Sequence, residues 1–336
     1  MNSKTWAAVA LFTTTISAQA QPAVTVFGIL DLSARSVTNG SNAVRQLGTD
    51  GLSNSRLGFK AEADVGDGLK AGAWIEAAVN GDTGTTNASG KLWHRRSTVS
   101  VYSPFGEVRL GRDLDATFWN LSAFDPFGTC GVGSGFNLVT NLGSGAATLL
   151  RADNAISYYL PSSLGGFYGQ LEVAAGEGVA GNSYKGGRFG YQQGPLNVAV
   201  ALATTHTATP DDFKMMNAGV SYNFGVVTAM ALTNVAKYAA KKQTNWELGL
   251  MAPVGAAGQL KASYQRADAS GAGTNSNDAH QMAVGYVHNQ SKELALYATY
   301  SQLKNEGNAA FVVGTPPVAA AGKTSKGYEI GIRYAF

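Results

Sequence analysis

The chain ends with the stretch Gly327-Tyr328-Glu329-Ile330-Gly331-Ile332-Arg333-Tyr334-Ala335-Phe336. A large apolar side chain stands at every second position, and small or charged residues stand between them. Because successive side chains of a strand point to opposite faces of a sheet, this spacing predicts a strand with one apolar and one polar face. The other interpretation is an ordinary amphipathic edge strand that happens to close the sequence.

The same period of two recurs along the rest of the chain. It is clearest in residues 196–203, 216–224, 245–250 and 259–265, where the apolar residues fall on one face of each segment. Beyond residue 20, no stretch reaches the roughly 18 consecutive apolar residues that a membrane-spanning helix requires. The pattern therefore predicts an all-β protein built from repeated hairpins.

The composition is unusual for a soluble domain. Only 14% of the residues are charged and 42 of 336 are glycine, whereas soluble domains average roughly 25% charged residues and about 7% glycine. A formal net charge of +3 does not support a broad basic face for nucleic acid. The single cysteine, Cys130, rules out an intramolecular disulfide framework. Together these features favour a membrane barrel over a secreted β-protein.

The first twenty residues have the layout of a secretory signal peptide. Lys4 supplies a positive start, residues 6–12 are apolar, and Ala18-Gln19-Ala20 is a small-x-small cleavage site. The alternative is a frayed N-terminal helix. We expect residues 1–20 to be removed and residues 21–336 to form a single transmembrane domain.

Turn residues divide the chain into strands joined by connections of two kinds. Short turns are predicted at residues 66–68, 104–106, 163–166, 194–195, 223–225, 254–258 and 289–292. Longer polar connections are predicted at residues 36–51, 80–91, 116–151, 178–184, 205–213, 238–243, 269–278 and 303–325. Such an alternation predicts a sixteen-stranded antiparallel transmembrane β-barrel, closed because an open sheet edge in hydrocarbon would leave backbone groups unpaired.

Several segments, in their order and spacing, resemble Gram-negative general porins of the beta-proteobacterial type. The resemblance covers the chain beyond residue 20 and rests on residues 24–31, 55–60, 66–70, 110–112, 125–128, 151–159 and 331–336. It implies a homotrimer in the outer membrane that crosses the membrane many times, surrounded by lipid and lipopolysaccharide. It implies passive diffusion of small anionic or neutral hydrophilic solutes, with no cofactor, no metal and no nucleic acid. Phe336 matches the family's C-terminal assembly signal.

The long connection at residues 116–151 is predicted to fold into the lumen as a constriction loop. Residues 116–150 contain several aromatic side chains but only one charged residue, Asp125, so the segment is not expected to extend into water. The alternatives are a subunit contact and an ordered external lid. Cys130 lies in this loop, either as a thiol open to the pore or as a buried, inert one.

The alternation of side chains along each strand also predicts which charged residues point into the lumen. In residues 55–63 it turns Arg56 and Lys60 inward, and in residues 151–160 it turns Arg151 inward. Arg56 and Arg151 also match the constriction arginines of the family. Arg95 matches a third, but the alternation set by Val99 and Val101 turns Arg96 inward instead, which leaves the pair open.

Three acids, Asp113, Asp115 and Asp125, are expected at or in the loop opposite this basic wall. Such an arrangement would produce a transverse field in a narrow channel and favour anions, since basic residues are in excess. The alternative is that each arginine simply pairs with a carboxylate and solvates the wall.

An enzyme is the least supported function. None of the four histidines, His94, His206, His280 and His288, has a serine or acid at catalytic spacing, and we interpret them as solvated bystanders. A substrate-specific outer-membrane channel is the main alternative to a general porin.

Overall fold

The structure is a computed structural model that describes residues 23–86, 90–314 and 320–336. The predicted signal peptide, residues 1–20, lies outside the described residues. Within those three ranges, no helix is long and apolar enough to cross a bilayer. In the described part of the chain, the regular structure consists mainly of strands, with one short α-helix and one 3₁₀ turn.

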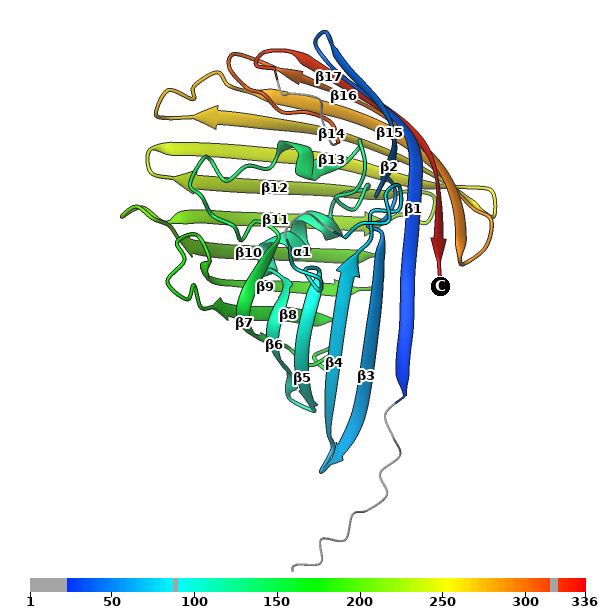
Figure 1. The fold of residues 1–336 in the computed structure, drawn as a ribbon, viewed down its shortest axis with the longest axis vertical. Helices are drawn as coiled ribbons and strands as arrows, with labels where there is room; N and C mark the ends of the chain where they lie inside the picture. The colour runs from blue at the N-terminus through cyan, green and yellow to red at the C-terminus, as the bar shows by residue number, and fades with distance from the viewer. Residues whose placement is uncertain (1–22, 87–89, 315–319) are drawn as a thin grey trace, which may run out of the picture.

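The described residues form seventeen strands in a single antiparallel sheet (Figure 1), in which each strand pairs with the next along the chain except β2 and β3. They are β1 Val24–Asn39, β2 Asn42–Thr49, β3 Arg56–Gly66, β4 Leu69–Ala78, β5 Arg96–Ser103, β6 Gly106–Leu114, β7 Arg151–Tyr159, β8 Phe167–Ala174, β9 Ser183–Gln193, β10 Leu196–His206, β11 Phe213–Asn223, β12 Thr228–Tyr238, β13 Lys241–Val254, β14 Gly258–Ser270, β15 Ala279–Asn289, β16 Leu294–Asn305 and β17 Thr324–Ala335.

The seventeen strands form a barrel of sixteen positions. β2 and β3 pair with the same edge of β1, one after the other: β2 faces residues 32–39 of β1 and β3 faces residues 24–29. The two short strands therefore share one position in the wall. The predicted sixteen-stranded barrel is confirmed.

The barrel closes where the last strand meets the first. Residues 325–335 of β17 pair with residues 29–39 of β1. The terminal Phe336 extends this seam, because its amide donates to Gly28 O at 3.0 Å and its carbonyl accepts from Gly28 N at 2.9 Å. A Cβ on Gly28 would lie 2.3 Å from Phe336 Cζ, so the ring rests where Gly28 has no side chain.

In the barrel wall, apolar side chains are exposed on the outside and polar side chains are buried on the inside, the reverse of a soluble protein. On β17, Ile330 is 68% exposed on the outside, whereas the neighbouring Glu329 is 1% exposed on the inside. Exposed aromatic residues such as Phe105 and Phe224 cluster at the short-turn end, as expected for a girdle at the membrane interface. The apolar outer face is therefore suited to lipid, and the polar inner face to an aqueous lumen.

All seven predicted short turns lie between strands, but two of the predicted long connections are wrong. Most of residues 36–51 form a hairpin of β1 and β2, with Gly40 at φ +60° in the turn. Between β12 and β13 only Ala239 and Ala240 lie outside strands. Both errors come from strands whose paired ends carry polar residues on both faces, where the apolar alternation fails.

We expect deletion of Phe336 to prevent assembly rather than to change conductance. The deletion removes both hydrogen bonds to Gly28 and shortens the seam on which closure depends. The measurement is the amount of folded, heat-modifiable protein in outer-membrane fractions on gels. Phe336→Tyr keeps the backbone pairs and the ring, and should assemble normally. Normal levels of the truncated protein would contradict the prediction.

Candidate functional site

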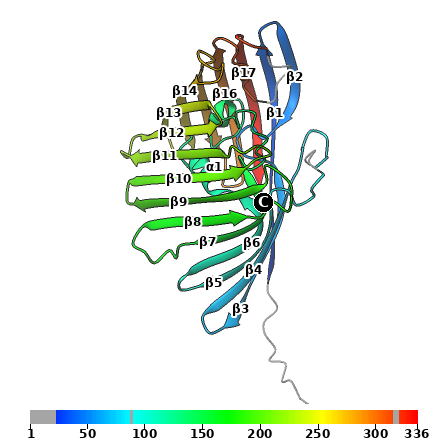
Figure 2. The same ribbon diagram turned by 90° about the vertical axis from the view of Figure 1, so that its left-hand side faces the viewer.

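The long connection between β6 and β7, residues 115–150 and here called the inner loop, packs against the inside of the wall. It contains α1 Ala116–Ala123 and the 3₁₀ turn η1 Gly135–Leu138. In both ribbon views α1 lies within the ring of strands (Figure 1 and Figure 2), and it contacts β9, β10 and β11. The Asp115 carboxylate begins the helix by accepting from Phe118 N at 2.8 Å.

Aromatic residues of the inner loop occupy space that strand glycines leave open. Phe124 is fully buried, and a Cβ on Gly219 of β11 would lie 2.1 Å from its ring. Likewise, a Cβ on Gly249 of β13 would lie 2.3 Å from Pro126 Cγ. The apolar loop is therefore seated on β10 to β13, where its aromatic surface is removed from water.

Buried polar side chains of the wall fasten the rest of the inner loop. Each bonds a backbone group of the loop, as buried backbone groups require. The contacts are Asn217 Nδ2 to Thr117 O at 3.0 Å, Gln243 Nε2 to Leu138 O at 2.7 Å, Gln281 Nε2 to Gly133 O at 3.1 Å, and Val132 N to Glu329 Oε1 at 3.1 Å. Glu329 also pairs with Arg35 at 2.8 Å, so this acceptor is itself held in place.

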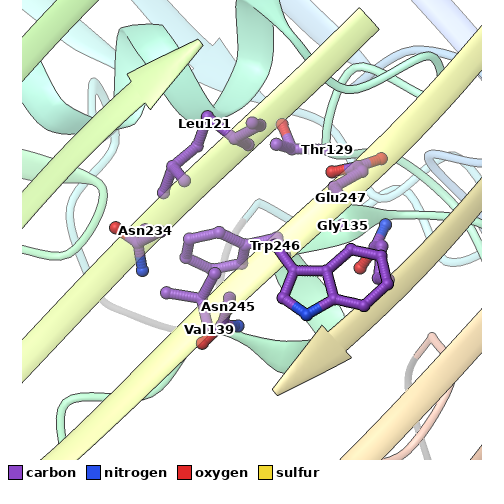
Figure 3. Close-up of a pocket in the computed structure, with 11 residues that line it drawn as sticks. Leu121, Thr129, Gly135, Val139, Asn234, Asn245, Trp246 and Glu247 are labelled. Carbon is purple, nitrogen blue, oxygen red and sulfur yellow. The ribbon is translucent and has the colours of Figure 1, made fainter. Parts of the chain in front are cut away.

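Two cavities of different size border the inner loop. Between the loop and β12 to β14 there is a cavity of about 20 Å³, bordered by residues such as Leu121, Asn234 and Glu247 (Figure 3). A cavity of that size holds a single water molecule. On the opposite side, an opening of about 450 Å³ separates the loop from β3, β5 and β7.

Three of the predicted basic residues, Arg56, Arg95 and Arg151, line this larger opening. They face loop residues that include Trp119, Thr129 and Cys130. The strands bring the arginines together from positions about 40 and 56 residues apart in sequence, through the pairing of β3 with β4, β4 with β5, and β6 with β7.

A single carboxylate sits among these three arginines. Glu76 on β4 is buried, and its Oε1 lies 2.5 Å from Arg95 Nε and 3.6 Å from Arg56 Nη1. Arg151 Nε donates to Arg95 O at 2.7 Å and forms no ion pair within the described ranges. Among the described residues, the ion pairs of these three arginines therefore involve one carboxylate, that of Glu76. Glu76 was not singled out from the sequence, although its place two residues before the end of β4 gives it the inward parity of Trp74.

Arg95 and Arg96 both face inward, which the strand alternation alone did not resolve. Arg96 is the first residue of β5; its Nε donates to Thr98 Oγ1 at 3.0 Å, and its guanidinium lies 4.2 Å from the Trp74 ring centroid. Arg95 precedes the strand, so the alternation does not fix its direction, and Glu76 turns it toward the opening.

Arg96 belongs to a second group of charges beside the three-arginine cluster. Lys60 Nζ lies 5.5 Å from the same Trp74 ring, and Arg96 pairs with Asp113 at 3.6 Å. Asp113 also binds Arg109 at 2.6 Å. The predicted basic wall is thus divided between the opening and this neighbouring group.

The three predicted acids do not form a row facing the arginine cluster. Asp113 is paired within the second group, and Asp115 caps α1. Asp125 accepts from the amides of Phe127 at 2.7 Å, Gly135 at 2.8 Å and Thr129 at 2.9 Å, and burial raises the pKa of its carboxyl. Residue spacing gave no sign of these backbone contacts, which hold the loop in shape.

His94 is not a solvated bystander, as the sequence suggested, but is buried directly before Arg95. Burial and the neighbouring arginines Arg151, Arg95 and Arg112 lower the pKa of its imidazole to about 4. It is therefore neutral near pH 7. The position next to two consecutive arginines was the available signal. No cluster of three or more metal-ligating side chains occurs among the residues the structure describes.

Cys130 borders the opening but is itself buried, with Asn54 Nδ2 3.2 Å from its sulfur. Burial and the nearby carboxylates Asp50 and Asp125 raise the pKa of this thiol to about 12. Since the thiolate is the reactive form, this environment corresponds to the inert thiol of the two alternatives.

Comparison with known proteins agrees with the fold. The family described as "Gram-negative porin" matches residues 6–308. The chain is 39% identical to outer membrane porin protein 32 of Delftia acidovorans, with 99% of each chain covered. It is 26% identical to an outer membrane porin protein of Bordetella pertussis, with 86% of this chain and 91% of that protein covered.

Among solved structures, the chain is similar to the anion-selective porin from Comamonas acidovorans. The TM-score is 0.85 at 37% sequence identity, with 94% of this chain and 100% of that chain covered. More distant barrels, such as OmpT of Vibrio cholerae with a TM-score of 0.71 at 14% identity, share the fold.

We expect Asp125→Ala to loosen the inner loop, because three backbone amides lose their acceptor. An unsatisfied buried donor costs about 1–3 kcal/mol. In planar bilayers the variant should show noisier single-channel current and a changed conductance. Asp82→Ala, which removes an exposed acid from another loop, is the control. Identical traces for the two variants would show that Asp125 does not hold the loop.

Proposed function

Because the chain belongs to the Gram-negative porin family, as the match to residues 6–308 and the relative at 39% identity show, we propose that this outer-membrane diffusion channel conducts anions in preference to cations. It is a porin, a passive channel that crosses the outer membrane with many strands. The proposal concerns which charge passes and which residues decide it.

The observation that carries the proposal is the excess of positive over negative charge at the larger opening. Arg56, Arg95 and Arg151 line the opening, and no acidic residue is among the described residues that line it, whereas the whole chain is nearly neutral for its length. A narrow aqueous passage with low-dielectric walls concentrates the field of the few charges that line it. Local charge therefore outweighs net charge in setting ion preference.

A second support comes from the relative of known structure. The Comamonas acidovorans porin, whose described property is anion selectivity, is 37% identical over nearly the whole chain. Such identity supports a shared wall chemistry, and the arginines of this chain supply the charge that anion preference requires.

We propose that the inner loop, predicted as residues 116–151, is the constriction. The cavity between the loop and β12 to β14 measures about 20 Å³, whereas the opening on the arginine side measures about 450 Å³, so ions would pass on the arginine side. The field there would come from a basic cluster with one enclosed carboxylate, instead of from two opposed rows of charge. Asp113, Asp115 and Asp125 then act by pairing with arginines or by shaping the loop.

A substrate-specific channel is the alternative within the same fold. It would need a site that binds one solute, and its current would saturate and be blocked competitively by that solute. We propose the general channel because the larger opening is lined mainly by charged guanidinium groups and by the loop, a combination suited to anions as a class. We also propose that the protein is not an enzyme, since its family and its fold are those of a channel.

We further propose cleavage after Ala20 and assembly as a homotrimer within lipid and lipopolysaccharide. The small-x-small site supports the cleavage, and the family resemblance supports the trimer. We expect denaturing mass spectrometry of the outer-membrane form to give a chain that starts at Gln21. Native mass spectrometry should give three such chains. An intact Met1, or a stable monomer, would overturn the corresponding part.

We expect Arg151→Ser to shift the reversal potential in a salt gradient toward that of a cation-selective pore. A unit charge about 4 Å from an anion stabilises it by about 1 kcal/mol even at the dielectric of water, so the anion-to-cation permeability ratio should fall about fivefold. Arg56→Ser should act in the same direction. Both shifts should shrink as salt rises, since screening lengths fall to about 3 Å at 1 M.

Lys323→Ser is the matched control, because it removes one positive charge from a position in the last long connection, away from the opening. It should leave the reversal potential nearly unchanged. A cation-selective wild type would refute the proposal. So would arginine variants whose reversal potential equals that of the control.

A further inference from the structure

Three lysines stand side by side on the outer surface of the barrel, at the end that carries the long loops. Lys214 on β11 is directly opposite Lys237 on β12, and Lys237 is directly opposite Lys242 on β13. All three side chains are exposed, and they share the face of the outward residues Met216 and Leu248. We call Lys214, Lys237 and Lys242 the lysine row.

Among the described residues, the lysine row has no acidic partner. None of its members forms an ion pair in that part of the chain. Adjacent strands are about 4.8 Å apart, so three positive charges start within about 10 Å of one another. Like charges directly opposite in a sheet are destabilising. An anion that bridges the three ammonium groups would remove this repulsion.

On the neighbouring strand β14, a basic residue of the same outer face is neutralised by acidic partners. Arg266 on β14 lies on the same outer face, opposite Trp246 of β13. It pairs with Asp268 at 2.5 Å and with Asp278 at 3.7 Å. The lysine row lacks such acids among the residues described, so its charge remains available to an external anion.

The wall immediately below the lysine row is apolar. The next outward residues, about 7 Å along the strands, include Met216 and Val235. Below them lies a shallow groove of about 340 Å³, lined by residues that include Ala218, Val220, Ala231, Trp246 and Leu248. β11, β12 and β13 run side by side in both ribbon views (Figure 1 and Figure 2). The surface is therefore cationic at its rim and apolar beneath.

We propose that the lysine row binds the phosphate groups of lipopolysaccharide, with acyl chains lying on the apolar wall below. In bacterial barrels the long loops face outside the cell, and the outer leaflet there is lipopolysaccharide, a phosphorylated lipid. Lysines at such a boundary keep their ammonium groups at the polar level while their stems cover apolar surface. The charge and the order of the two surfaces match this lipid, and the site is separate from the pore.

The test uses the folded, full-length protein in detergent and native mass spectrometry with purified lipid A that carries both phosphates. The wild type should retain lipid A, and Lys237→Gln with Lys242→Gln should weaken binding by about tenfold or more, because each lysine near an anionic lipid surface contributes roughly fivefold. Lipid A without phosphates should bind the wild type as weakly as the intact lipid binds the double variant. Lys237→Arg with Lys242→Arg should keep binding.

The matched control is Lys70→Gln with Lys292→Gln, which removes two exposed lysines from the short-turn end. It should bind lipid A like the wild type. The proposal is overturned if this control loses binding equally or if the row variant binds normally. It is also overturned if inorganic phosphate alone displaces the lipid, which would indicate a simple anion site. A change of oligomeric state in the row variant, with lipid A still bound, would instead assign the row to a contact between copies.

Discussion

The fold depends on the pairing of β17 with β1. In hydrocarbon, an unpaired backbone amide or carbonyl has no water to bind, so a sheet that spans the membrane must have no open edge. The seam meets this requirement along residues 29–39 and ends with the reciprocal bonds between Gly28 and Phe336. Closure also fixes which face of every strand points outward. A shift of one residue in the register of a strand would exchange its inward and outward side chains.

Closure turns the usual relation between polarity and burial inside out. The apolar face is exposed, whereas groups such as Gln281 and Glu329 are buried within the ring. These buried groups are stable because each is bonded to the backbone of the inner loop. The wall and the loop therefore depend on each other, since the loop supplies partners to polar side chains that would otherwise face an open lumen, and the wall glycines supply room for its aromatics.

The inner loop packs against β10 to β14, and the charged cluster lies on the opposite side of the lumen. There, Glu76 holds Arg95 and lies near Arg56, while Arg151 is tied to the Arg95 carbonyl. The one carboxylate orders the arginines without cancelling them. A nearly neutral protein can in this way gather three arginines around one opening.

The sequence by itself determined the barrel, its seven short turns and the inward direction of Arg56 and Arg151, because all of these follow from a period of two within single strands. The tertiary structure alone decided the rest. Arg95 lies just outside a strand, so no alternation fixes it, and Glu76 meets the arginines only through strand pairing. Asp125 looked like a pore acid but binds its own loop's amides. Contacts between residues distant in the chain depend on register and loop packing, which no local pattern encodes.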